Sequence, residues 1–165
     1  MTESLTRDEI LAAAVALGRG QYGGALATMH AEDGTPYVTF VLFHLRDDGT
    51  VLFGSGASPQ HSRNMEATPE VSFLIDNREV IRADWTAFDR VVIEGHAEKV
   101  ARDDSRYATF LRELAQKNRL AAHFTRDGNL FQILPRRLVL MKGIDAGRLV
   151  VDFGSGWPVR TGAAQ

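Results

Sequence analysis

The sequence predicts a mainly β protein of one domain, in which short antiparallel strands close into a small Greek-key barrel with flanking helices. A length of 165 residues fits one domain, because single cores typically contain about 100–200 residues. From about residue 24, β-branched and aromatic runs alternate with turn signals, and no strand–helix–strand alternation recurs. We place a helix at 7–17, the barrel at about 24–142 and a tail at 143–165.

The first helix is predicted over Arg7 to Leu17. Thr6 and Glu9 have the spacing of a capping box, in which each side chain satisfies a free amide at the helix start. Apolar residues then recur at helical spacing, at Ile10, Leu11, Ala14 and Val15.

Glycines at positions 18, 20 and 23 follow this helix and match the pattern Gly-x-Gly-x-x-Gly. A dinucleotide site needs a strand before this pattern and a helix after it, so that the phosphates meet a helix N-terminus. Here a helix precedes the pattern and a strand follows it. The glycines are therefore interpreted as a helix stop.

Five strands are predicted next: Gly24 to His30, Pro36 to Leu45, Val51 to Gly56, Glu70 to Asn77 and Arg90 to Val100. Turns are expected at Glu32-Asp33-Gly34 and Asp47-Asp48-Gly49, because Asp-Gly tolerates positive φ. The second strand is apolar on both faces from Tyr37 to Phe43. We expect it to be covered on both sides, by the barrel or by a second subunit, and to lie at the centre of the sheet.

The last third of the chain predicts one more helix and two strand segments. Apolar residues at i, i+3, i+4 and i+7 indicate a helix from about Asp103 to Gln116 that flanks or plugs the barrel. Phe131 to Leu134 and Arg137 to Lys142 are predicted to form one bulged strand interrupted by Pro135. Arg148 to Phe153 is a final short strand or tail element.

The composition excludes several classes of protein. The net charge is −2 and no dense run of Lys and Arg occurs, so we do not expect nucleic-acid binding. The chain has no cysteine, which removes disulfides, thiolate nucleophiles and zinc–thiolate sites. No apolar run approaches the roughly 20 residues of a membrane span, and the N-terminus does not resemble a signal peptide. A cytoplasmic location is expected, without membrane partners.

No metal site or catalytic residue is predicted. The histidines are too far apart for metal-ligand spacing, and His-Glu-x-x-His does not occur. Ser55 and Ser155 each stand in Gly-Ser-Gly, which is not the Gly-x-Ser-x-Gly of a nucleophile elbow. The five histidines are His30, His44, His61, His96 and His123.

The segment from Gly54 to Asn64 predicts a phosphate site. Ser58 and Pro59 form an N-cap followed by the residue favoured at the first helical position, so a short helix should begin directly after a strand. Its free amides and partial positive charge attract an anion. Hydroxyls, a guanidinium and glycines that permit close approach lie nearby, at Ser55, Ser62, Arg63, Gly54 and Gly56. The alternative is a capped surface helix whose arginine is merely solvated.

The order of several motifs resembles the pyridoxamine 5′-phosphate oxidase-like, FMN-binding split-barrel superfamily. The motifs are Gly24 to Thr28, Pro36 to Phe43, Leu52 to Ser55, His61 to Met65, Pro69 to Leu74 and Arg90 to Val100. The resemblance extends over about residues 24–141. It is closer to the short members, including the haem-utilisation type, than to the biosynthetic oxidase.

This resemblance implies a homodimer with FMN in a cleft between the subunits. The segment His61-Ser62-Arg63 would hold the FMN phosphate, and Ser55 would lie near the phosphate or the ribityl chain. Thr39 and Val41 would border the ring or the ribityl chain. Arg90 would reach the flavin from the second subunit, at a place where the biosynthetic oxidase tends to carry Gln.

The leading hypothesis is an FMN-dependent oxidoreductase that acts on a small molecule, with substrate and electron donor unassigned. The alternatives on the same fold are a deazaflavin-dependent reductase and a non-catalytic module that binds flavin or haem. The oxidase's Arg and His pattern is not recognisable after Arg137, so vitamin B6 synthesis is not predicted. The haem-ligating tail is also absent, since His123 is the last histidine. Two loops offer substrate contacts at Arg82, Trp85 and His123, and we expect Trp85 at the subunit interface.

Overall fold

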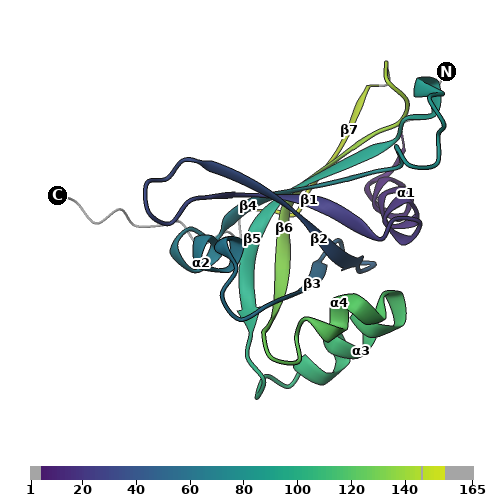
Figure 1. Cartoon of the computed structure of the whole chain (residues 1–165). Helices are drawn as coiled ribbons and strands as arrows, with labels where there is room; N and C mark the ends of the chain where they lie inside the picture. The colour runs from purple at the N-terminus through teal and green to yellow at the C-terminus, as the bar shows by residue number, and fades with distance from the viewer. Residues whose placement is uncertain (1–4, 146, 155–165) are drawn as a thin grey trace.

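Seven antiparallel strands form one sheet that closes into a barrel in the computed structural model, which describes residues 5–145 and 147–154 (Figure 1). The sheet order is β3-β2-β1-β4-β5-β6-β7, and β3 also pairs with β6, so six strands close the barrel and β7 extends it. The fold class predicted from the sequence is confirmed. The strands are β1 Gly23–Met29, β2 Pro36–Leu45, β3 Val51–Ser55, β4 Glu70–Asp76, β5 Arg90–Val100, β6 Asn129–Met141 and β7 Arg148–Asp152.

Strand β6 is long enough that one of its edges pairs with two different strands. Residues 129–133 pair with β3, and residues 137–141 pair with β7. The register against β5 shifts between Glu94 and Gly95, so the predicted bulged strand is confirmed. Pro135 lies at this shift, where a residue without an N–H interrupts the ladder least.

Alternate residues of the strands fill the barrel. Phe43 and Phe73 meet edge to face with ring centroids 5.2 Å apart, and Phe53 stacks on Phe131 at 5.5 Å. All four rings are at most 1% exposed. Helix α1 (Arg7–Arg19) begins with the predicted capping box and packs its buried face on this core.

Helix α1 continues two residues beyond the predicted end at Leu17. Gly18 lies inside it, and an added Cβ there would stand 2.8 Å from Leu45 Cδ2. This glycine therefore permits close packing of helix on strand instead of stopping the helix. Gly20 is the C-cap, so the helix stop itself is confirmed.

Within the single chain the first half of β2 is not covered on both sides, so the expected cover by a second subunit stays a prediction. The expectation that β2 lies at the centre of the sheet is wrong, because β2 is second in the strand order. The ladder between β2 and β3 ends at the pair Phe43 and Phe53, so the first half of β2 pairs only with β1. Val38 and Phe40 are 65% and 64% exposed on its outer face. Beyond Phe53 strand β3 separates from β2, because Gly54 and Ser55 pair with β6 and not with β2.

Two helices cover the outer face of β3 (Figure 1). Helix α3 (Tyr107–Lys117) begins four residues later than predicted, because Asp104 holds a turn by accepting from the Arg106 amide at 2.8 Å. Helix α4 (Arg119–His123), which the sequence reading missed, is capped by Asn118. A short 3₁₀ helix, η1 (Trp85–Ala87), lies in the loop between β4 and β5.

Among the described residues, no helix is long and apolar enough to cross a membrane. The same part of the chain contains no group of three or more metal-ligating side chains.

Candidate functional site

Three of the sequence-predicted site residues meet where β3 ends and helix α2 (Gln60–Ala67) begins. Ser55 Oγ lies 2.8 Å from His61 Nε2 and 2.7 Å from Ser62 Oγ. Ser55 and Ser62 are each 3% exposed, whereas His61 is half-buried. The structure therefore brings two hydroxyls and an imidazole together at a helix start.

The start of α2 differs by one position from the prediction. Pro59, and not Ser58, is the N-cap, because its backbone is extended with ψ 160°. Its carbonyl accepts from the amides of Ser62 at 3.1 Å and Arg63 at 3.4 Å. Proline has no polar side-chain atom, so this helix start has no side-chain cap, and its first turn holds no acidic residue.

This helix start has the properties of an anion site. The first amides of a helix have no acceptor inside the helix, and the aligned peptide dipoles place partial positive charge there. In α2 these are the amides of Gln60 and His61. A phosphate would supply the acceptors that the missing cap does not.

Arg63 is exposed and folds back over the loop that precedes α2. Its Nη1 donates to the Ser58 carbonyl at 2.7 Å, and its Nη2 donates to Gln60 Oε1. Gln60 in turn donates to Glu32 Oε2 at 3.1 Å. The guanidinium therefore lies beside the helix start, within a chain of polar contacts that an incoming anion could exchange.

Asn64 is a residue of this site that the sequence reading missed. Its side chain is fully buried, and Oδ1 accepts from the Ala31 amide at 3.0 Å and from Gln60 Nε2 at 2.8 Å. Its Nδ2 donates to Thr28 Oγ1 at 2.9 Å. Asn64 thus ties α2 to the hairpin of β1 and β2. The available signal was its spacing of four residues from Gln60, which puts both on one helix face.

The remaining predicted residues do not join this cluster within one chain. Val41 is 6% exposed and belongs to the main core, and Thr39 is half-buried on the same face of β2. Arg90 donates to the Gly143 carbonyl at 3.2 Å and lies over the Phe88 ring. Trp85 packs edge to face on Phe88 in the same region.

Gly54 does not leave room for a ligand, which corrects the sequence-based expectation. An added Cβ would stand 2.2 Å from the Ala121 carbonyl oxygen of α4. The glycine is needed because α4 packs directly on β3. Gly56 differs, since the nearest atom to an added Cβ there is Pro59 Cδ at 4.0 Å.

Burial lowers the pKa of His61 from its ordinary value of 6.5, so the imidazole at this site is neutral at pH 7. Burial also lowers the pKa of His44, an effect that exceeds the opposing attraction of Glu113.

Because the unfolded chain binds these protons more readily, the free energy of unfolding should fall as the pH drops through about 6.5. We expect lower stability at about pH 5.5 than at about pH 7.5, measured by urea unfolding. His61→Gln should make this dependence shallower, and His44→Gln should do so separately. An unchanged slope in both variants would contradict the burial argument.

Six strands close this barrel, and β2 and β3 separate beyond the pair Phe43 and Phe53. This arrangement defines the chain as a split-barrel protein. The sequence model of the family described as pyridoxamine 5′-phosphate oxidase matches residues 10–146. The chain belongs to this family.

Several solved structures share the fold. A haem-binding protein from Mycobacterium smegmatis is 21% identical with a TM-score of 0.73, over 90% of this chain and 58% of that one. The haem storage protein HutZ from Vibrio cholerae is 23% identical with a TM-score of 0.64, over 78% and 92% of the two chains. An FAD-binding protein from Mesorhizobium loti is 18% identical with a TM-score of 0.62, over 77% and 88%. No curated protein matches the sequence.

Proposed function

We propose that this protein is an oxidoreductase that binds FMN at the start of α2. The observation that carries the proposal is the uncapped helix start, at which Ser55, His61 and Ser62 converge. Family membership and a flavin-binding neighbour of the same fold support a flavin as the ligand.

The donors at this site suit a phosphomonoester. The amides of Gln60 and His61 would donate to the phosphate, and the Arg63 guanidinium would offset its charge. The hydroxyls of Ser55 and Ser62 lie behind these groups and would accept or donate as the phosphate requires. Bound FMN supplies the electron-transfer chemistry, whereas the protein residues bind and orient it.

The decisive experiment is titration of the purified protein with FMN while quenching of the flavin fluorescence is followed. Saturation at one FMN per subunit supports the proposal. If FMN does not bind, parallel titrations with a deazaflavin cofactor and with haem decide between the alternatives on this fold, and the visible spectrum identifies whichever is bound. Reduction of the bound flavin by a nicotinamide cofactor would separate an enzyme from a carrier.

Arg63→Ala should weaken FMN binding by about 1–3 kcal/mol, because a charge-assisted contact to phosphate is lost. Arg112→Ala is a matched control, since Arg112 is an exposed arginine on α3. Its FMN affinity should equal that of the unchanged protein. Equal affinity in both variants would remove Arg63 from the site.

We also propose that two chains pair through the outer face of β2. Exposed large apolar residues on a strand mark an interaction surface, and Val38 and Phe40 are such residues. Val38→Asp should shift the protein toward monomer in light scattering at micromolar concentration. Glu66→Asp, an exposed change on α2, is the control. A monomeric unchanged protein would contradict this pairing.

A further inference from the structure

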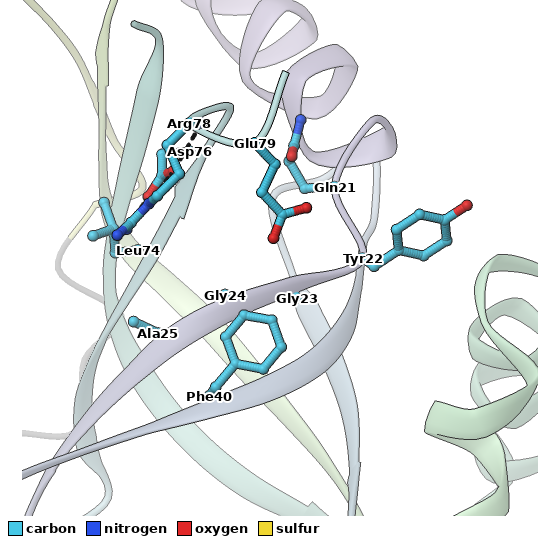
Figure 2. Close-up of a pocket in the computed structure, with 10 residues that line it drawn as sticks. All are labelled: Gln21, Tyr22, Gly23, Gly24, Ala25, Phe40, Leu74, Asp76, Arg78 and Glu79. Carbon is cyan, nitrogen blue, oxygen red and sulfur yellow. Dashed lines mark hydrogen bonds and ion pairs between the residues drawn. The ribbon is translucent and has the colours of Figure 1, made fainter. Parts of the chain in front are cut away.

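A cavity of about 270 Å³ lies on the outer face of β1 (Figure 2). Its floor is formed by Gly23, Gly24 and Ala25, and Leu74 and Phe40 contribute from the two neighbouring strands. Pockets for drug-sized ligands measure roughly 300–1,000 Å³, so this one suits a single ring system.

A carboxamide lines this cavity. No hydrogen bond of the Gln21 side chain is found among the described residues, and its amide atoms are accessible although the residue as a whole is only 8% exposed. A carboxamide offers both N–H donors and a carbonyl acceptor, so it can pair with a ligand that presents the same two groups.

The cavity also has a flat apolar surface. The Phe40 ring lies directly over Gly23, where an added Cβ would stand 2.0 Å from Phe40 Cζ. The ring is 64% exposed, so a planar ligand could stack against it. Figure 2 shows the ring beside the glycine floor.

The charges around the cavity favour a neutral hydrogen-bond donor over an anion. In Figure 2 the Glu79 carboxylate lies over the glycine floor, and it has no ion-pair partner among the described residues. Asp76 and Arg78 neutralise each other through a pair of hydrogen bonds.

We infer that this cavity binds a planar nitrogen heterocycle that carries an amide or lactam edge and no negative charge. The N–H and C=O of such an edge would pair with the Gln21 carboxamide, and a further N–H would donate to Glu79. The heterocycle would stack on Phe40. The inference stands on this cavity alone and holds whether or not α2 binds FMN.

The cavity shares no lining residue with the proposed FMN site at the start of α2. Phe40 points outward from β2, whereas its neighbours Thr39 and Val41 point to the opposite face, because side chains alternate along a strand. Phe40 belongs both to this cavity and to the surface that we propose pairs with a second chain. The test therefore uses the full chain in its own oligomeric state.

Nicotinamide and nicotinate are suitable probes because they have nearly the same shape. Nicotinamide carries a neutral amide where nicotinate carries a charged carboxylate. We expect saturable shifts of the Gln21, Gly23 and Gly24 amide resonances with nicotinamide, at millimolar concentration or below. Nicotinate should bind at least tenfold more weakly, because its charge faces Glu79. Glu79→Gln should narrow this difference, whereas Arg112→Ala should preserve it.

Gln21→Leu should weaken nicotinamide binding roughly threefold to tenfold, as expected for lost hydrogen bonds. If Gln21→Leu does not fold, the comparison of the two probes in Glu79→Gln still tests the inference. Equal binding of the two probes, or no saturable binding, would overturn the inference. Displacement of nicotinamide by saturating FMN would also overturn it, because the cavity would then belong to the flavin. Retained binding with FMN present supports a separate site.

Discussion

Phe43→Ala should lower the free energy of unfolding by about 3–5 kcal/mol, among the largest effects expected for a single change in this protein. Phe43 is completely buried in the barrel and meets the Phe73 ring edge to face. Its removal would lose the apolar burial of a whole ring and leave a cavity that the closed sheet cannot fill. Urea unfolding measures this loss as a lower midpoint with an unchanged slope.

Phe40→Ala is the matched control, because it removes the same side chain three residues earlier on the same strand. Phe40 is 64% exposed, so its loss should cost less than about 1 kcal/mol. Comparable losses in the two variants would mean that the inner and outer faces of β2 are wrongly assigned. Both should be measured at low protein concentration, where pairing of chains contributes least.

Asn64→Ala should lower the free energy of unfolding by about 2–4 kcal/mol, because it removes three hydrogen bonds of a fully buried side chain. The Thr28 hydroxyl, 3% exposed as a residue, would lose its donor. The Ala31 amide and Gln60 Nε2 would lose their shared acceptor. Since these contacts fix α2 against the β1–β2 hairpin, FMN affinity should fall as well.

Asn118→Ala is the comparison for this second variant. Asn118 also uses its side chain to hold a helix, as it accepts from the Leu120 amide at 3.0 Å and the Ala121 amide at 3.3 Å. Its site is partly exposed, so water can replace the lost bonds and the expected cost is about 1 kcal/mol. FMN affinity should not change in Asn118→Ala. A loss of FMN binding in both variants would indicate general destabilisation.

Local sequence signals were reliable where one short segment decides the structure. The bounds of β2 and β5 agree with the prediction, because alternation and turn residues act over a few positions. The N-cap of α2 was predicted at Ser58 but lies at Pro59. The ψ angle decides whether a residue is the cap or belongs to the first turn, and this angle depends on how the preceding loop packs. The five-residue helix α4 gave no periodic signal to detect.

The candidate phosphate site was predictable because Ser55, His61, Ser62 and Arg63 lie within nine consecutive positions, on a strand end and the following helix. Asn64 was missed for the opposite reason. Its burial follows from the β1–β2 hairpin, which brings Ala31 and Thr28 against α2. A contact between segments that are far apart in the sequence leaves no local pattern from which it could be predicted.

The sequence by itself determined the mainly β class, the strand positions, the helix stop near Gly20 and the polar cluster at the start of α2. The tertiary structure decided which face of each strand is buried, and it assembled the cavity from Gln21, Phe40 and Glu79, which come from three separate segments. The physical reason is that backbone propensity and side-chain alternation act over neighbouring residues. Burial and hydrogen-bond partnership depend on which distant strands pair.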